Sequence, residues 1–315
     1  MRIAWPGAGR LTLVLLAVVP AAMAYPWQTV TGQWALGIAV AVAIILLGQW
    51  RGMFFTTMIR RRIALLGSRE SRGGARHLVQ RTGADAQTTV VLRVLPESDG
   101  ELPLDVIAGY LDRYGLRCEA ARITSRKTAA GPTTWIGLTM SAATNLAELQ
   151  ARSARIPLRD TAEVALRRLA DHLRELGWAV TTSEVDVPDI LGPQAKAKWR
   201  AVEDGPKSFV AAYALRVDDA LPETLAKLWA HSSPEVWTAL QITPDGKVAA
   251  ACAIRTDEMP GRAAPLPELT SLRGYQWEAL DAMSPTATDR LPGATATTAD
   301  LASLRWPMRG TAVKT

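Results

Sequence analysis

The residues that most often carry out chemistry are few in this sequence, and their spacing matches no catalytic or metal-binding motif. The three histidines, His77, His172 and His231, lie far apart, with neither an HExxH motif nor a Cys/His cluster around them. The sequence contains no GxxxxGK[ST] motif for nucleotide phosphates and no GxGxxG after a predicted strand. We therefore expect no metal, no cofactor and no small-molecule substrate, and a protein that is not an enzyme.

Two further groups of side chains have to be weighed as sites. Asp218 and Asp219 follow a predicted strand and precede a predicted helix, so helix capping explains them better than catalysis does. Four tryptophans are candidate interface residues: Trp199, Trp229, Trp237 and Trp277. Because a tryptophan ring also packs well in a core or lines a ligand pocket, those two alternatives stay open.

The positive charge of the chain is concentrated near its N-terminus. The formal net charge is +6; Arg2 and Arg10 supply +2, and eight arginines against Glu70 supply +7 in residues 51–81, which leaves −3 for residues 82–315. A protein that binds nucleic acid usually carries its basic surface on the folded domain, so we expect no nucleic-acid partner. The cysteines, Cys118 and Cys252, form no paired motif and fit a reducing compartment.

Two almost charge-free runs, residues 11–24 and 35–48, come first in the chain. An α-helix needs about 20 residues to cross about 30 Å of hydrocarbon, and with their flanks the runs cover residues 11–27 and 30–50. We predict a hairpin of two transmembrane helices within residues 1–50. A signal peptide cleaved after Ala24 is the alternative for the first run. Gly37 and Ala41 are candidates for close helix packing, with lipid contact as the alternative.

The segment after the second run is rich in arginine, and six of its residues are candidates for the membrane surface: Arg51, Arg60, Arg61, Arg62, Arg69 and Arg72. Positive side chains beside a span are retained in the cytoplasm, so both termini and everything after residue 50 are predicted to be cytoplasmic. We predict an arginine-rich juxtamembrane helix and linker over residues 51–87. Its arginines either set this topology alone or also hold the helix on anionic lipid.

From residue 88 the hydrophobic pattern predicts a mixed α/β (α+β) fold. Strands are expected at residues 88–96, 116–127, 133–142 and 178–186, and helices at 102–115, 145–154 and 159–178. We expect Asn145 to cap the second helix, and Asp160 with Glu163 to cap the third. The third helix carries the strongest pattern, with a predicted buried stripe of Leu166, Leu169, Leu173 and Leu176.

The order of elements then repeats. A strand at 208–219 and a helix at 221–232 precede a hairpin over 235–258 and a last helix at 267–283. Both stretches therefore follow the order strand, helix, strand, strand, helix, which indicates two related modules, residues 88–187 and 188–283. The remaining tail, residues 284–315, is rich in Ala, Thr and Pro, and we expect it to be mobile or to lie on a partner.

Several segments together resemble EccE, a membrane component of the type VII (ESX) secretion systems of actinobacteria. They are "YPWQTVTGQWALG" between the predicted spans, "GMFFTT" after them, "IAGYLDRYGLRC", "EVWTAL" and, most specifically, "NLAELQARSARIPLRDTAEVALRRLADHLRELGW". The resemblance covers nearly the whole chain. It is strongest to the ESX class that is linked to iron and siderophore use.

The resemblance implies a structural subunit that braces an inner-membrane complex with EccB, EccC and EccD. In such a complex the EccC ATPase supplies the energy, and small helical proteins of the WXG100 and PE/PPE kinds are exported. The resemblance implies no catalytic residue at any position of this sequence. Two other classes stay open: a membrane-tethered cytoplasmic transferase that acts on a lipid-linked substrate, and a tethered binding module that works alone.

Overall fold

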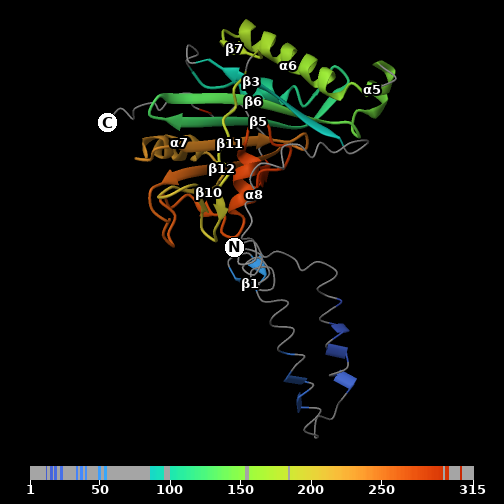
Figure 1. The fold of residues 1–315 in the computed structure, drawn as a ribbon. Coiled ribbons are helices and arrows are strands. Elements are labelled where there is room, and N and C mark those ends of the chain that lie inside the picture. The colour runs from blue at the N-terminus through green and yellow to red at the C-terminus, as the bar shows by residue number, and fades with distance from the viewer. Residues whose placement is uncertain are drawn as a thin grey trace. The chain divides into compact units, whose positions relative to one another are not determined.

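The structure, a computed structural model, describes residues 86–95, 100–152, 156–183, 185–293, 295–297 and 306, together with 49–50, 53–54 and scattered residues between 12 and 40. The chain divides into two compact units, residues 1–70 and 71–315, which are drawn in Figure 1.

In the first unit, the described residues between 12 and 40 are helical. Two short strands follow, β1 (Gln49–Trp50) and β2 (Met53–Phe54), which pair antiparallel. Among the residues that the structure describes, no helix combines the length and the apolar character that a bilayer crossing requires. The second predicted span therefore does not run to Trp50 as one helix, because Gln49 and Trp50 form a strand, and Met53–Phe54 do not belong to the predicted juxtamembrane helix.

The candidate membrane residues are mostly untested by the structure. Gly37 lies in a helical stretch and is exposed, with no other atom within 4 Å of the position that a Cβ would take. Ala41 and the six arginines of the predicted membrane surface lie outside the described residues. The two spans, their packing and their orientation remain predictions.

The second unit is built on one large sheet, which runs across the centre of the domain in Figure 1. Its strand order is β7-β3-β6-β5-β11-β12-β10-β9-β8. The long strands are β3 (Gln87–Val94), β5 (Leu116–Thr128), β6 (Gly131–Ser141), β10 (Phe209–Leu215), β11 (Val236–Ile242) and β12 (Lys247–Thr256). The short ones are β4 (Asp112–Arg113), β7 (Val180–Thr181), β8 (Lys196–Ala197), β9 (Val202–Glu203), β13 (Thr270–Ser271) and β14 (Thr295–Thr297).

The first half of this unit, residues 86–183, contains β3, helix α4 (Leu104–Ala108), β5, β6, helices α5 (Leu146–Arg152) and α6 (Leu158–Glu175), and β7. Its strands lie side by side in the order β7-β3-β6-β5, and all neighbours are antiparallel. Strand β6 therefore lies between β3 and β5, which are parallel to each other and joined through α4. This is a split β-α-β arrangement. The connection from β3 to β5 contains α4, and the connection from β6 to β7 contains α5 and α6.

The second half, residues 185–293, repeats much of this order with β10, helix α7 (Leu221–Ala230), β11, β12 and helix α8 (Gln276–Met283). Strand β12 lies between β10 and β11, as β6 does between β3 and β5. The halves join where β5 and β11 pair antiparallel, with Ile123 opposite Leu240. The repeated order that we predicted is present, but both stretches share one sheet. The module boundaries at 187 and 283 stay predictions.

Alternate side chains of β10, β11 and β12 enter two different cores. On the first face of the sheet, α4, α6 and α7 cover residues such as Leu92, Ile123 and Leu240. On the second face, α8 covers the alanines of β12 and the ring of Trp237. Because β11 and β12 are covered on both faces, β11 is buried along its whole length.

Two predicted helices and one predicted strand are shorter than we expected. The helix predicted at 102–115 ends at Ala108, because Asp112–Arg113 form β4 and pair with β5 instead. Tyr114 and Gly115 take positive φ angles of 57° and 72° in the tight turn between these two strands. The helix predicted at 267–283 begins at Gln276, because Thr270–Ser271 pair with β10 instead. Strand 178–186 is likewise reduced to β7.

The predicted side-chain caps are not formed, although Asn145 does stand directly before α5 and its carbonyl accepts a hydrogen bond from the N–H of Leu149 at 2.9 Å. The Asn145 side chain binds the backbone N–H and C=O of Arg117, each at 2.8 Å, and so fastens the start of β5 rather than a helix end. Helix α6 begins after Pro157 without a side-chain cap, so Asp160 lies inside its first turn. Leu176 follows the last helical residue and is 50% exposed, whereas the other three leucines of the predicted stripe are buried.

The prediction of a mobile or partner-bound tail is wrong for its described residues. Residues 284–291 cross the second face of the first half, where the buried Arg122 guanidinium donates hydrogen bonds to the carbonyls of Ser284 and Ala287, at 3.2 and 2.7 Å, and to that of Asp289. Farther on, Trp306 is fully buried in the core of the first face. We call residues 284–291 the strap.

Candidate interaction site

Two of the four candidate tryptophans lie inside the domain. Trp229 is 5% exposed and Trp237 is 1% exposed, so their role is core packing and they are not the surface interface residues that we predicted. Trp237 stacks on Trp135 across the junction of the two halves, with ring centroids 5.8 Å apart. Trp199 and Trp277 are half-buried, and an interface role for them stays a prediction.

The buried charges of the domain are engaged by its own groups. Arg122 is held by the strap, and burial lowers the pKa of its guanidinium to about 10, so it stays charged at neutral pH. Arg255 binds Glu235 at 2.6 Å and Asp204 at 2.7 Å, and Arg126 binds the other carboxylate oxygen of Glu235. These contacts fasten loops to the sheet.

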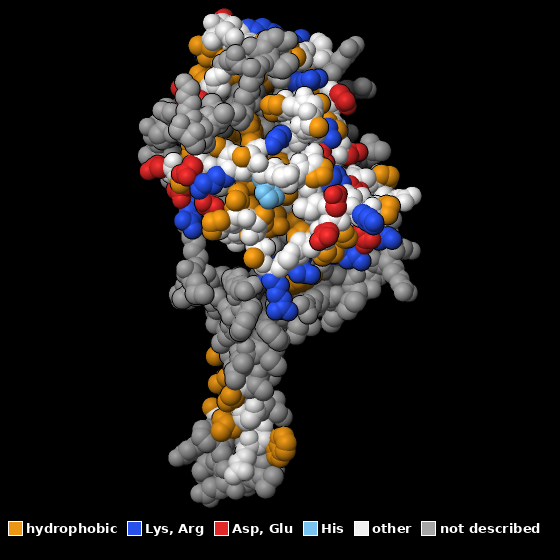
Figure 2. All heavy atoms as spheres, turned by 90° about the vertical axis from the view of Figure 1, so that its left-hand side faces the viewer, with side chains coloured by type: hydrophobic (Ala, Val, Ile, Leu, Met, Phe, Trp, Pro, Cys, Tyr) orange, Lys and Arg blue, Asp and Glu red, His pale blue; other side chains and the backbone are white. Residues whose placement is uncertain are grey.

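The surface of the domain mixes both signs of charge. Figure 2 shows one face, on which lysine and arginine side chains alternate with aspartate and glutamate among apolar residues. Among the described residues, no group of three or more His, Cys, Asp or Glu side chains is placed to hold a metal ion.

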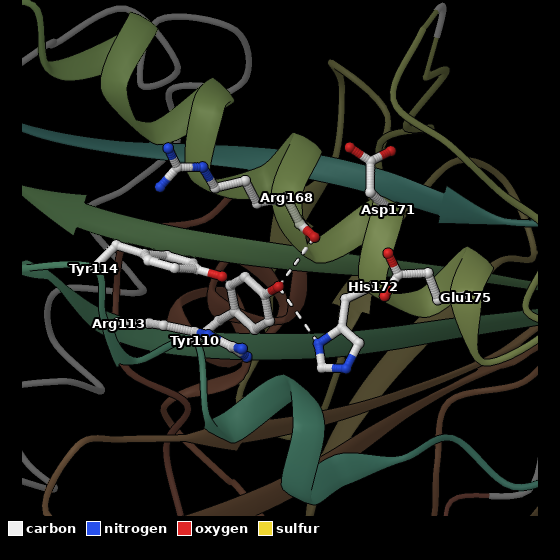
Figure 3. Close-up of a pocket in the computed structure, with 7 residues that line it drawn as sticks. All are labelled: Tyr110, Arg113, Tyr114, Arg168, Asp171, His172 and Glu175. Carbon is white, nitrogen blue, oxygen red and sulfur yellow. Dashed lines mark hydrogen bonds between the residues drawn. The ribbon is translucent and has the colours of Figure 1, made fainter.

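One hollow in the first half brings several polar side chains together. It has a volume of about 450 Å³ and lies between the turn that precedes β5 and the exposed side of α6. Figure 3 shows its lining, which consists of Tyr110, Arg113, Tyr114, Arg168, Asp171, His172 and Glu175. We call it the α6 hollow.

Tyr110 forms the floor of the α6 hollow. Its side chain is 5% exposed and its hydroxyl donates a hydrogen bond of 3.0 Å to the backbone carbonyl of Arg168. The His172 ring lies beside it, with Nδ1 3.5 Å from the hydroxyl. Burial raises the pKa of Tyr110, so the phenol stays neutral and keeps its donated hydrogen bond at physiological pH. This contact fixes the turn against α6.

Tyr114 stands on the rim between two guanidinium groups. The Cζ of Arg168 lies 4.6 Å from the centre of its ring and that of Arg113 lies 5.2 Å away, as Figure 3 shows. Arg113 also lies 4.7 Å from the ring of Tyr110. Stacking on aromatic rings holds the guanidinium planes but satisfies none of their N–H donors. The ring of Tyr114 is itself 57% exposed.

The charges of the α6 hollow are only partly neutralised within the chain. Asp171 pairs with Arg174 at 2.6 Å. Within the part of the chain that the structure describes, neither Arg113 nor Arg168 forms an ion pair, and Glu175 forms none either. The α6 hollow thus has two unpaired cations at one end and an unpaired carboxylate two helical turns away.

Sequence reasoning missed this site for an identifiable reason. We predicted Tyr114 on a helix and Leu176 in the core, and the structure places both on the surface. The signal that would have found the turn is Tyr114-Gly115 followed by a strand, because a glycine at that point favours a positive φ. The spacing of Arg168, Asp171, His172 and Glu175 along one side of α6 was also visible in the sequence.

Comparison with known proteins gives the chain a family. Residues 128–187, which contain β6, α5, α6 and β7, match the family described as "Putative type VII ESX secretion system translocon, EccE". The chain is 47% identical over 313 residues to the ESX-3 secretion system protein EccE3 of Mycobacterium tuberculosis (strain CDC 1551 / Oshkosh), covering 96% of this chain and 93% of the relative. It is 48% identical over 285 residues to EccE3 of Mycolicibacterium smegmatis, covering 89% and 88%.

The match extends through both compact units and confirms the resemblance that the sequence segments indicated. The residues that match the family include α6, the helix that supplies most of the side chains lining the α6 hollow. On this identity and coverage, the chain belongs to the EccE family of the ESX, or type VII, secretion systems.

Proposed function

We propose that the chain is a structural subunit of the inner-membrane core complex of an ESX secretion system. The observation that carries this proposal is the identity of 47% to EccE3, sustained over 96% of the chain. Its partners are the EccB, EccC and EccD subunits, and EccC supplies the energy for export of small helical WXG100 and PE/PPE proteins. The resemblance to the iron- and siderophore-linked ESX class extends the proposal to a system that serves iron acquisition.

The proposed placement has the chain crossing the membrane twice within residues 1–50, with the second unit and both termini in the cytoplasm. The two apolar runs and the arginines after residue 50 support this placement. Cysteines introduced one at a time at Thr29, between the two predicted spans, and at Ser271, in the second unit, test it. With a thiol reagent that does not cross membranes, only position 29 should react in intact cells, and both should react after permeabilisation.

The direct test of the subunit proposal is purification of the tagged full chain from native membranes in a mild detergent, followed by mass spectrometry. The proposal predicts a large complex that contains EccB, EccC and EccD. Recovery of the chain alone, from membranes in which those three proteins are present, would reject it. A tethered transferase would instead be recovered alone and would convert a lipid-linked substrate.

Packing of the predicted spans can be tested in the same preparation. Gly37→Leu together with Ala41→Leu should reduce recovery of the complex, because larger side chains prevent a close approach of helices. Leu36→Ala, which leaves the small residues in place, is the matched control. Full recovery of the complex with the double variant would mean that this side of the helix contacts lipid.

A further inference from the structure

The exposed apolar side chains of the second unit are unevenly distributed. Among its described residues, the large hydrophobic side chains that are exposed are Tyr114, Leu146, Ile156, Leu176 and Met259. All but Met259 belong to the first half, and Tyr114 and Leu176 are the most exposed, at 57% and 50%. Tyr114 stands beside Arg168, and Leu176 follows the end of the same helix. An apolar side chain therefore stands near each end of the α6 hollow.

The charged residues of α6 along the hollow occur in a specific order. Arg168, Asp171, His172 and Glu175 are spaced at i, i+3, i+4 and i+7, so they lie on one side of the helix. Arg168 at one end and Glu175 at the other have opposite charge and no ion-pair partner among the described residues. A rise of about 1.5 Å per residue separates them by about 10 Å along the axis.

The order of charges along α6 is complementary to the same order read in the opposite direction. If a second α6 lies antiparallel to the first, with the midpoint between Asp171 and His172, Arg168 of each copy faces Glu175 of the other. The same alignment places Asp171 opposite His172, and it brings Leu176 opposite the end of the hollow where Tyr114 stands. A twofold contact uses each pairing twice, which is the defining property of an isologous interface.

Other arginines of the same helix do not show this property. Arg159 pairs with Glu163 at 3.0 Å, and Arg174 pairs with Asp171 at 2.6 Å, both within one copy. The Arg167 side chain donates a hydrogen bond to the carbonyl of Glu163 and lies outside the hollow. Arg168 and Glu175, which form no ion pair among the described residues, lie at the two ends of the α6 hollow, where the antiparallel alignment would pair them.

We propose that the α6 hollow is a contact site between two copies of this chain, with the two α6 helices antiparallel and Arg168 of each copy bound to Glu175 of the other. This contact rests on the proposed structural role and extends it, because each copy would then also stabilise a second copy. It does not require EccB, EccC or EccD to be present. Exposed ion pairs are weak individually, so the contact forms mainly between copies that the membrane or the complex already holds close together.

Charge reversal gives a test that separates a second copy from any other partner. Two differently tagged full-length chains are co-expressed without the other subunits, extracted in mild detergent at low salt, and one tag is used to recover the other. Arg168→Glu alone and Glu175→Arg alone should each lower recovery about tenfold, because every attraction becomes a repulsion at two symmetric places. Arg167→Glu, the neighbouring residue with the same charge change, should leave recovery unchanged.

Two rescues complete the design. The double variant Arg168→Glu/Glu175→Arg restores opposite charges across the twofold contact, and so does a mixture of the two single variants. Both should recover to near the level of the original chain, which also shows that each variant folds. Failure of the original copies to recover each other, failure of both rescues, or an equal loss with Arg167→Glu would each overturn the proposal. Because the test omits the other subunits, it remains separate from the test of the complex.

Discussion

The two halves of the second unit use the same strand order in different ways. In the first half, α4 and α6 lie on the same face of the sheet, and the chain returns to β3 through β7. In the second half, α7 lies on that face, but α8 lies on the opposite one, and the chain then leaves as the strap across the first half. A repeated order of elements therefore fixes strand adjacency, whereas the helix placement depends on which face is already covered.

This difference gives the halves different surfaces. The second half is covered on both faces, and its central strands are almost entirely apolar, with alanines of β12 facing α8. The first half has polar side chains on its second face, where Arg122 donates to the strap carbonyls and Thr124 donates to the carbonyl of Met283 at the end of α8. Beside its helix α6, Tyr114 and Leu176 are exposed. The second half thus acts as the scaffold, and the first half carries the candidate contact site.

The largest expected effect concerns the tail, which ties the halves together. Trp306 is fully buried on the first face, and its indole N–H donates to the hydroxyl of Ser125 at 3.3 Å. Trp306→Ala should lower the free energy of unfolding by about 3–5 kcal/mol, because a large ring leaves a cavity. Urea unfolding followed by circular dichroism measures this change. An effect below about 1 kcal/mol would show that the tail does not belong to the core.

The last helices of the two halves should respond very differently to the same substitution. Leu280 of α8 is fully buried, whereas Leu176 after α6 is 50% exposed. Leu280→Ala should cost about 2–4 kcal/mol in the free energy of unfolding and Leu176→Ala less than about 0.5 kcal/mol. Thermal unfolding of both variants gives the comparison. Equal losses would mean that Leu176 is packed as firmly as Leu280.

These predictions also mark how far the sequence alone leads. The long strands and α6 were predictable because period-two and helical patterns record which side chains are buried. The positions of Asn145 and Arg122 were not, since their hydrogen-bond partners lie 28 and more than 160 residues away in the chain. The face that α8 would cover was equally invisible, because both faces of β12 are apolar. Tyr114 is exposed because it lies in a turn. Its spacing from the preceding apolar residues fits a helix, so the sequence pattern did not indicate that turn.

The strap gives the next smaller effect. Arg122→Leu should lower the free energy of unfolding by about 2 kcal/mol, because three strap carbonyls lose their donors while the cost of burying a charge disappears. Gln241 lies opposite Arg122 in the register and accepts a hydrogen bond from the backbone N–H of Leu291. Gln241→Leu should cost about 1 kcal/mol. Proteolysis near residue 287 should become faster in the first variant, and an unchanged rate would contradict the role of Arg122.

The smallest effect concerns the two thiols, one in each half. Burial raises the pKa of Cys118 to about 12 and also raises that of Cys252, so both are unreactive thiols in the folded chain. An unfolded thiol ionises near pH 8.5, so the contribution of the two thiols to stability should be constant below that pH and should fall as the pH rises above it. Cys118 lies at the register shift between β5 and β6, and it should therefore be labelled by a thiol reagent before Cys252. The reverse order would contradict this ranking of local opening.

The claim that the first half carries the contact and the second half the scaffold can be tested with one photo-crosslinking experiment. A photoreactive amino acid is introduced at position 114 or, as the control in the second half, at position 259, because Tyr114 and Met259 are both exposed. After irradiation of native membranes, position 114 should give an adduct of twice the mass of the chain, joined near residues 175–176 of a second copy, and position 259 should not. Adducts to a second copy from position 259 and none from position 114 would contradict the account.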